Sequence, residues 1–397
     1  MSKQDHTKPA TAIAIVSNEM TPYRLHQLER LRDGLEGVRV INIFTHSIHG
    51  NSMPWKIEIG SDLGIVFDEA NRLERPGQFM NRRSLALYRS IRDTIDREGV
   101  RMVVMLGYND LPRLLLIRHL RRKGVPIVFT ADSNIFGDAR VQGVKRLVKG
   151  AFMRWLLRNV DGLMPMGTCG RAYFRSYLDH DLPEFIVPYE PDYAALATRD
   201  EAGVASFRAK HGLREGRRRF MYCGRFVEVK RVDVLLRAFV AMAPSHPEWD
   251  LVLAGDGPLR EQLVAMIPPA LRDRVTFTGF LQFDDISRCY HACDALVLPS
   301  EYEPWALVVT EAMAAGMAVI ASDVVGAAVD LVRPGVNGYL VTPRSVDSLE
   351  SALRRAASPG AIDALKRKAP AILASWREAT DPVAGFEAAI ARFTRSS

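Results

Sequence analysis

Short, continuous runs of apolar residues recur along the chain, separated by longer segments with helical periodicity. In the first half these runs are TAIAIVS (11–17), VRVINIFT (38–45), VRMVVMLG (100–107) and VPIVFTAD (125–132). The second half contains RRFMYCGR (218–225), WDLVLAGDG (249–257), RVTFTGF (274–280), ALVLPS (295–300), MAVIASD (317–323) and GYLV (338–341). Apolar strands that alternate with helices are typical of parallel sheets with both faces covered. The sequence therefore predicts an α/β protein with two doubly wound, Rossmann-like domains.

A polar, proline-containing stretch with little periodicity separates the two halves near residues 187–203. The length of 397 residues also indicates more than one domain. We expect a disordered tail (1–10), an N-terminal domain (11–190), a C-terminal domain (191–380) and a C-terminal helix (381–397) that could return to the N-terminal domain.

Composition narrows the class of protein. Hydrophobic residues make up 48% and charged residues 25% of the chain, which is typical of a soluble globular protein. The formal charge of +7 fits an anionic ligand or an acidic membrane surface, and by itself does not indicate nucleic acid. No apolar run approaches the ~20 residues that cross a bilayer, and the first residues contain no secretory apolar region. A cytoplasmic location is expected.

Unusual residues follow the predicted strands of the second half, where open α/β folds bind their ligands. Gly224 ends one strand and allows close approach of backbone, while Arg225 and Lys230 supply cations that suit a diphosphate. Gly255 lies in a second strand-to-turn segment. Backbone groups at Phe280 and Leu281 could hydrogen-bond a planar base. Each segment alone is also compatible with an ordinary loop or a surface cation.

The stretch EPWALVVTE (303–311) places two glutamates around a predicted helix start near Trp305. Free N–H groups at Trp305, Ala306 and Leu307 would form an anion site. Glu303 precedes that site, and Glu311 lies about 9 Å farther along the helix axis. A sugar, a diphosphate and a ribose could occupy these places in that order.

Four segments together resemble a known family: GRFVEVKRVDVLLRAF (224–239), LAGDGP (253–258), FTGF (277–280) and PSEYEPWALVVTEAMAAGMAVIASD (299–323). They are similar to the retaining nucleotide-sugar glycosyltransferases of the GT-B architecture, carbohydrate-active family four. The resemblance covers roughly 215–345. It implies two domains facing a cleft, with the acceptor bound by residues 11–190 and the nucleotide sugar by residues 191–380.

The resemblance also implies roles for individual residues. Glu303 and Glu311 match the family's paired glutamates, the first on hydroxyls of the transferred sugar and the second on the donor ribose. Arg225 and Lys230 match the basic pair that stabilises the leaving diphosphate, so no metal or cofactor is expected. Glu303, Arg225 and Lys230 are thus the predicted catalytic residues. The predicted donor site comprises Gly224, Arg225, Lys230, Gly255, Phe280, Leu281, Glu303, Trp305, Ala306, Leu307 and Glu311, with a UDP- or GDP-sugar as donor.

The chain departs from the family pattern at several positions. Ala306 stands where the family commonly has glycine, and Trp305 where it has phenylalanine. On the acceptor side the family's residues are replaced, and Thr21, Tyr23, Asp132 and Asn134 are the candidates for the acceptor cleft.

Residues 144–158 form a basic, apolar-striped helical pattern that could either pack on the sheet or rest on an anionic membrane surface, at the inner face of the membrane.

The expected reaction is transfer of a hexose-type sugar to a saccharide or lipid-linked acceptor. Two alternatives stay open: a glycoside hydrolase that uses Glu303 and Glu311, and a non-catalytic nucleotide- or membrane-binding module. A nucleic-acid partner is not expected.

Overall fold

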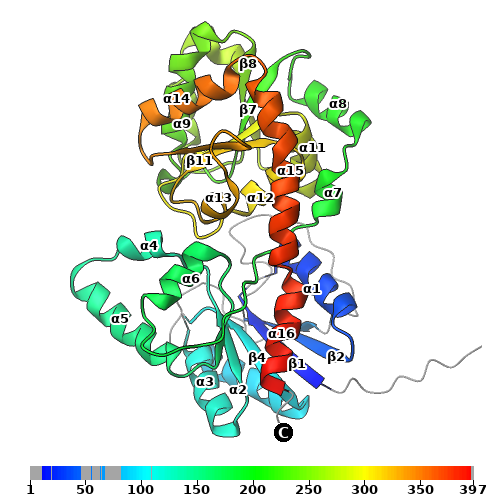
Figure 1. Cartoon of the computed structure of the whole chain (residues 1–397), viewed down its shortest axis with the longest axis vertical. Helices are drawn as coiled ribbons and strands as arrows, with labels where there is room; N and C mark the ends of the chain where they lie inside the picture. Colours follow the sequence, from blue (N-terminus) through cyan, green and yellow to red (C-terminus); the bar gives the residue numbers. More distant parts are fainter. Residues whose placement is uncertain are drawn as a thin grey trace, which may run out of the picture.

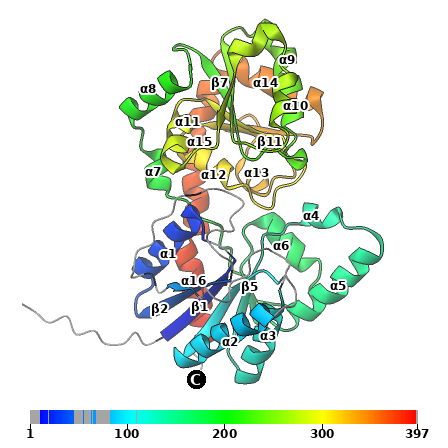
Figure 2. The ribbon, with the colours of Figure 1, turned by 180° about the vertical axis from the view of Figure 1, so that it is seen from behind.

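The computed structural model describes residues 11–18, 20–45, 55, 63, 65–67, 82–108 and 110–394. The expected tail (1–10) lies outside the described residues. The chain folds into two α/β domains stacked along the long axis of the molecule, each built on a parallel six-stranded sheet (Figures 1 and 2). This confirms the predicted fold class.

The N-terminal sheet has the strand order β3-β2-β1-β4-β5-β6. Its strands are β1 (Thr11–Ser17), β2 (Val38–Phe44), β3 (Ile65–Phe67), β4 (Val100–Leu106), β5 (Ile127–Thr130) and β6 (Gly162–Leu163). Its helices are α1 (Pro22–Gly34), α2 (Arg82–Arg97), α3 (Leu111–Lys123), α4 (Ile135–Ala139), α5 (Gly143–Leu157) and α6 (Thr168–Arg175). Alternate residues of β1 enter different cores, Ala14 and Val16 on one face and Ile13 and Ile15 on the other. This sheet is therefore packed on both faces.

The C-terminal sheet has the order β12-β11-β10-β7-β8-β9, which is the same topology as that of the first sheet. Its strands are β7 (Arg218–Cys223), β8 (Trp249–Ala254), β9 (Val275–Gly279), β10 (Ala295–Leu298), β11 (Ala318–Ser322) and β12 (Gly338–Val341). Its helices are α7 (Tyr193–Ala197), α8 (Glu201–Lys210), α9 (Val232–Met242), α10 (Arg260–Ala265), α11 (Phe283–His291), α12 (Leu307–Ala314), α13 (Gly326–Leu331), α14 (Val346–Ala357) and α15 (Ala361–Ala379), with short 3-10 turns η2 (Glu228–Lys230), η3 (Ala243–Ser245) and η4 (Pro269–Arg274).

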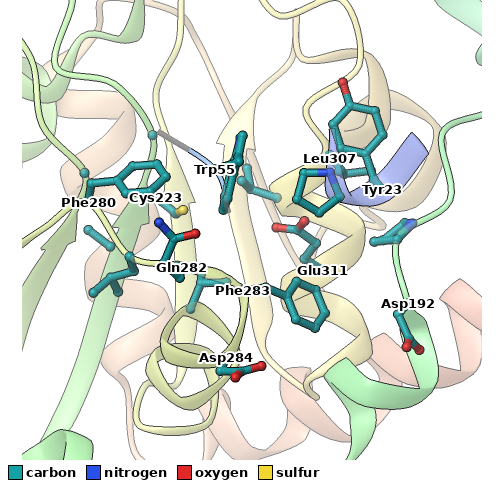
Figure 3. A pocket seen from close by; sticks show the side chains of 18 of the residues that line it. Tyr23, Trp55, Asp192, Cys223, Phe280, Gln282, Phe283, Asp284, Leu307 and Glu311 are labelled. Carbon is teal, nitrogen blue, oxygen red and sulfur yellow. The ribbon is translucent and has the colours of Figure 1, made fainter. Parts of the chain in front are cut away.

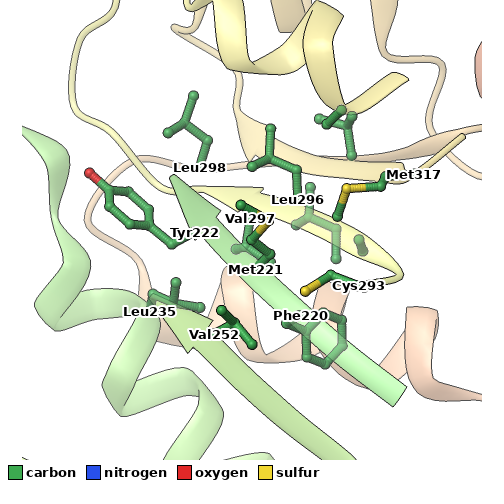
Figure 4. Close-up of a cluster of buried hydrophobic side chains, with 14 of the residues drawn as sticks. Phe220, Met221, Tyr222, Leu235, Val252, Cys293, Leu296, Val297, Leu298 and Met317 are labelled. Carbon is green, nitrogen blue, oxygen red and sulfur yellow. The ribbon is translucent and has the colours of Figure 1, made fainter. Parts of the chain in front are cut away.

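Large apolar side chains fill the centre of this second domain. Figure 4 shows Phe220 and Met221 of β7 beside Val252 of β8 and Leu296 of β10, all of them buried. Because both faces of these strands are covered, the sequence reads as continuous apolar runs rather than as alternation.

The chain ends by returning to the first domain. Helix α16 (Pro382–Thr394) follows α15 and packs against α1 and β4, so the two red helices in Figure 1 run from one domain to the other. Phe386 and Ile390 join the core of the N-terminal domain. Arg30 of α1 forms an ion pair with Asp381 at 2.9 Å, at the start of α16. The two domains are thus joined by the linker and by this helical crossing.

Candidate active site

A cavity of about 900 Å³ lies between the two domains, at the carboxyl ends of the C-terminal strands. Figure 3 shows the aromatic side chains of Tyr23, Trp55, Phe280 and Phe283 around the carboxylate of Glu311. The predicted site residues that line the cavity are Tyr23, Gly224, Arg225, Gly255, Phe280, Leu281, Leu307 and Glu311. Such a volume is large enough for a nucleotide sugar.

The turns after β7 and β8 meet backbone to backbone at the cavity wall. Gly224 has φ 151° and Gly255 has φ 138°, which are conformations that L-residues rarely adopt. A Cβ atom on Gly255 would lie 1.9 Å from the carbonyl oxygen of Gly224. Glycine at these two positions therefore lets the backbone itself form the wall.

Lys230 and Glu303, predicted on separate segments, lie in contact. Their side chains form an ion pair, and the Ser300 hydroxyl donates to Glu303 Oε1 at 3.0 Å. Burial raises the pKa of the Cys223 thiol to about 12, while the charge of Lys230 opposes that shift. Neither Lys230 nor Glu303 lines the cavity itself, whereas Cys223, which Lys230 influences, does. The neighbouring turn supplies Arg225, an exposed cation that lines the cavity directly.

Helix α12 presents its first turn to the cavity through Leu307, Val308 and Glu311. It begins at Leu307 rather than near Trp305, because Ala306 adopts φ 74° and breaks the helical backbone. Burial raises the pKa of Glu311 to about 7, although the Tyr290 hydroxyl donates to Glu311 Oε2 at 2.7 Å and opposes this shift. The carboxyl group is thus poised between its two protonation states near neutral pH.

Trp305 was predicted to bind the donor through its backbone N–H at the helix start, and its side chain packs elsewhere. The indole is buried and stacks on Trp376 of α15, with ring centroids 5.2 Å apart and an interplanar angle of 24°. It does not line the cavity. An apolar ring that follows a strand end packs most favourably against another buried ring, and the sequence does not show that this partner lies 71 positions later in α15.

Phe280 and Leu281 line the opposite end of the cavity. Trp55 of the N-terminal domain packs on Phe280, with ring centroids 4.9 Å apart and an interplanar angle of 65°. Gln282, Phe283 and Asp284 line the cavity beside them. These aromatic and backbone groups offer a planar ligand both stacking surfaces and hydrogen-bonding partners.

The predicted acceptor residues do not form one cluster. Tyr23 lines the cavity and packs against Tyr189, with centroids 4.8 Å apart. The Tyr189 hydroxyl donates to Asp132 Oδ1 at 2.6 Å and accepts from Arg24 Nη2 at 2.9 Å. Asp132 is exposed, whereas Thr21 is buried.

Arg24 and Tyr189 were missed by the sequence interpretation. Their only signals were a cation at the start of a helix and a tyrosine in the linker. Asn134 is buried, and its amide donates to the carbonyl oxygen of Glu303 at 2.7 Å. It therefore links the two domains instead of pointing into the cavity.

No cluster of three or more His, Cys, Asp or Glu side chains that could hold a metal ion occurs among the described residues. Metal-independent chemistry stays a prediction. Within the same part of the chain, no helix has the length and apolar character required to cross a membrane.

Comparison with known proteins adds a family to this geometry. Residues 204–367 match the family model described as glycosyl transferases group 1. The C-terminal domain is a group 1 glycosyltransferase domain. An uncharacterized glycosyltransferase of Methanocaldococcus jannaschii is 34% identical over 145 residues, which is 36% of this chain and 37% of that protein. A glycogen synthase of Mycobacterium tuberculosis is 29% identical over 233 residues, 58% of this chain and 54% of that protein. The matches thus span about half or less of these relatives.

Solved structures match over nearly the whole chain, beyond the residues that the family model covers. Sucrose-phosphate synthase from Thermosynechococcus elongatus superposes with a TM-score of 0.74 at 20% identity, covering 98% of this chain and 100% of that chain. HepE from Anabaena, solved with UDP and glucose, superposes with a TM-score of 0.70 at 17% identity, covering 96% and 99%. At this level of identity the likeness concerns the fold. The fold is GT-B, with two Rossmann-like domains facing each other.

Proposed function

We propose that the protein is a retaining glycosyltransferase that moves a hexose-type sugar from a UDP- or GDP-sugar to a saccharide or lipid-linked acceptor. The observation that carries the proposal is the joining of two ion-binding groups at one cavity edge. Arg225 and Glu311 line the cavity, the latter one helical turn inside α12, and the Lys230–Glu303 ion pair lies near Cys223, another lining residue. The HepE structure with UDP and glucose supports a nucleotide-sugar donor by analogy of fold.

The proposed transfer forms a bond between an acceptor oxygen and the anomeric carbon of the sugar. The bond from that carbon to the diphosphate breaks, and negative charge develops on the departing nucleoside diphosphate. Arg225, Lys230 and the free N–H groups at the start of α12 would stabilise this charge. Because Lys230 contacts Glu303, one cation can join the diphosphate to the carboxylate that accepts hydrogen bonds from the sugar hydroxyls. The retaining outcome rests on the family resemblance.

The test removes the cation and then the carboxylate. We expect Lys230→Ala to lose both UDP or GDP binding, measured by calorimetry, and sugar transfer. Glu303→Gln should keep nucleotide binding and lose transfer. Lys368→Ala, which removes an exposed lysine of α15, serves as control. Unchanged nucleotide affinity in Lys230→Ala would contradict the phosphate assignment. Hydrolysis of glycosides without nucleotide affinity would favour the hydrolase alternative, and binding without turnover would favour the non-catalytic module.

The nucleotide base and the sugar require a separate measurement. A thermal-shift panel of UDP-, GDP- and ADP-sugars identifies the donor that stabilises the protein most, because a ligand that binds only the folded state raises the unfolding temperature. The selected donor is then offered with candidate saccharide and lipid-linked acceptors.

We also propose that α5 rests on an anionic membrane surface. Val144 and Leu147 are each 74% exposed, Val148 is 65% exposed and Trp155 is 36% exposed. The opposite face of the helix is the buried one, through Gly150, Met153, Leu156 and Leu157. The outward apolar stripe therefore does not pack on the sheet. Exposed cations flank it at Lys145, Arg146, Arg154 and Arg158. This combination suits the boundary between lipid headgroups and acyl chains.

Vesicle binding tests the membrane contact. We expect the protein to sediment with phosphatidylglycerol vesicles but not with phosphatidylcholine vesicles, and we expect the double variant Leu147→Ser/Val148→Ser to remain in solution. Leu85→Ser, which removes an exposed leucine of α2, is the matched control. Equal sedimentation of the double variant and the wild type would contradict the proposal. Nucleotide binding should be the same in all three proteins.

A further inference from the structure

Helix α6 of the N-terminal domain is capped by a residue of the other domain. Its N-cap residue is Gly167, which has no side chain to accept from the first free N–H groups. Asp330 of α13 takes this role: Oδ2 accepts from the Thr168 N–H at 2.9 Å, and Oδ1 accepts from the Thr168 hydroxyl. A carboxylate at a helix N-terminus is stabilised by the free N–H groups and by the helix dipole. The cap thus spans the domain boundary.

A second link joins Asn134 to the segment that carries Glu303. Asn134 is the N-cap of α4, where its Oδ1 accepts from the Gly137 N–H at 3.0 Å. Its Nδ2 donates in the opposite direction, to the carbonyl oxygen of Glu303 at 2.7 Å and to that of Pro304 at 3.3 Å. One buried amide therefore fixes the start of a helix in one domain and the backbone of a predicted catalytic residue in the other.

Two glycines allow the domains to approach this closely. A Cβ atom on Gly167 would lie 2.4 Å from Asp330 Oδ2 and 2.5 Å from the Trp305 ring. A Cβ atom on Gly137 would lie 2.4 Å from the Tyr302 ring. All three of the nearest atoms at each glycine belong to the C-terminal domain. Trp305 has little freedom to move aside because it stacks on Trp376.

We propose that these contacts form an interdomain clasp that positions Glu303 for sugar transfer. The clasp consists of Asn134 and Thr168 on one side and Asp330 and the Glu303 carbonyl on the other. The inference rests on the proposed transferase function, since it assigns positioning residues for that reaction. Within the clasp, the side chain of Glu303 contacts Lys230 while its backbone is held by the opposite domain. Closure of the domains and assembly of the site are then one event.

The first variant, Asn134→Asp, separates the two hydrogen bonds of Asn134. Aspartate still accepts from the Gly137 N–H, so α4 keeps its cap. It cannot donate to the Glu303 carbonyl and instead sets a carboxylate against it. We expect kcat to fall about tenfold, the equivalent of one hydrogen bond, while the affinity for UDP or GDP stays at the wild-type value. The melting temperature should also fall, because a buried carboxylate then faces two carbonyl oxygens. Arg140→Ala, which removes only a peripheral ion pair with Glu301 at 3.7 Å, is the control.

The second variant, Gly167→Ala, places a methyl wedge between the domains. Gly167 has φ −177°, an extended conformation that alanine adopts freely, so the methyl group meets only its neighbours across the boundary. We expect the radius of gyration from small-angle scattering to increase and kcat to fall, with nucleotide affinity retained. Adding Trp305→Phe, which removes ring atoms in contact with the wedge, should restore part of kcat.

The results separate the clasp from the underlying function. Wild-type kcat in Asn134→Asp, together with unchanged scattering in Gly167→Ala, would overturn the clasp. If the wild type neither binds nor uses any nucleotide sugar, the proposed transferase function fails, and the scattering of Gly167→Ala still reports on the domain contact. Loss of UDP or GDP affinity together with kcat in Asn134→Asp would show a general structural role and would also count against positioning.

Discussion

At the carboxyl edge of the C-terminal sheet, closely packed backbone forms the wall of the cavity. At the same edge of the N-terminal sheet, a buried cluster of polar side chains joins the strand ends. Gly224, Gly255 and Ala306 all adopt positive φ beside the cavity. In the N-terminal domain, Arg113 is buried between Asp110, Asn18 Oδ1 at 2.6 Å and Thr45 Oγ1 at 3.1 Å. The two sheets share a topology, so the contrast arises from their strand ends alone.

This contrast explains why the site residues of one half can be recognised in the sequence more readily than those of the other half. A backbone wall requires glycine or another small residue at fixed places in a local motif, which the sequence shows directly. A wall of side chains requires partners brought together from distant segments, and many different residue combinations can form it. The family model accordingly matches residues 204–367 of the C-terminal half and does not extend into the N-terminal half. The following substitutions test that contrast.

The largest effect is expected for Arg113→Leu. Burial, with a contribution from nearby Arg24, lowers the pKa of Arg113 to about 9, which shows how poorly solvated this cation is. Removing it leaves the Asp110 carboxylate buried without its partner, and breaking a buried pair costs about 3–5 kcal/mol. Unfolding by urea, followed by circular dichroism, measures the loss of stability.

The double variant Arg113→Leu/Asp110→Ser is the control for Arg113. In the native protein the backbone N–H of residue 113 donates to Asp110 at 2.9 Å and so caps α3. A serine at position 110 can still accept this hydrogen bond. We expect it to recover much of the lost stability because no charge stays unpaired. If the single and double variants were equally unstable, the edge would depend on packing rather than on charge pairing.

The next largest effect is expected for Gly255→Ala in the backbone wall. The new Cβ would collide with the Gly224 carbonyl and would occupy a strained φ. Strain and overpacking together should lower the free energy of unfolding by roughly 2–4 kcal/mol and abolish nucleotide binding. Gly335→Ala is the control that measures the cost of a positive φ without a steric collision. Gly335 has φ 79°, and nothing lies within 4 Å of its Cβ position. Equal losses in both variants would remove the case for a close-packed wall.

The strands were predictable because each is a continuous apolar run in a buried parallel sheet. For example, β1 (Thr11–Ser17) has the predicted bounds, and β10 (Ala295–Leu298) lies within the predicted run. The strand β3 (Ile65–Phe67) was not predicted, because three residues give too little pattern to distinguish a strand from a loop. Local hydrophobicity thus determines most of the sheet, but not its short edge.

The site was predictable only where it depends on local motifs. Glu303 and Lys230 were named from their segments, yet their ion pair joins residues 73 positions apart. The Asp132–Tyr189–Arg24 chain and the Asn134–Glu303 link likewise join distant segments, 57 to 169 positions apart. Such partners are chosen by the tertiary fold, and no spacing rule along one segment reveals them. The stacking of Trp305 on Trp376 could not be read from the sequence for the same reason.

A third prediction concerns the dependence of stability on pH. Burial raises the pKa of Glu311 from 4.5 to about 7. Between these values the unfolded chain has released this proton and the folded chain still holds it, so stability falls as pH rises through this window. Glu311→Gln removes the contribution. The variant should be more stable than the wild type at pH 8, on the order of 3 kcal/mol, with no difference near pH 4.

Thermal unfolding at a series of pH values measures the Glu311 effect. Tyr290→Phe is a second test of the assignment, because the Tyr290 hydroxyl holds the pKa of Glu311 down. Its removal should raise this pKa further and extend the pH range in which stability falls to higher pH. A constant difference between Glu311→Gln and wild type at every pH would contradict the assignment of this titration to Glu311.

The smallest effect is expected for Ala306→Gly. It is the only substitution to glycine that we expect to stabilise the folded protein. Ala306 is one of three non-glycine residues with positive φ in the described part of the chain, at 74°. A left-handed L-residue costs about 1–2 kcal/mol, of which the greater unfolded-state freedom of glycine offsets a part. We expect a net gain of about 1 kcal/mol in urea unfolding. The same change at exposed Ala374, in the helical interior of α15, should instead lose about 1 kcal/mol. A gain in stability at Ala306 together with a loss at the control position would show that backbone conformation limits stability at the cavity wall. A loss at Ala306 would show instead that its methyl group stabilises the fold by packing more than its positive φ destabilises it.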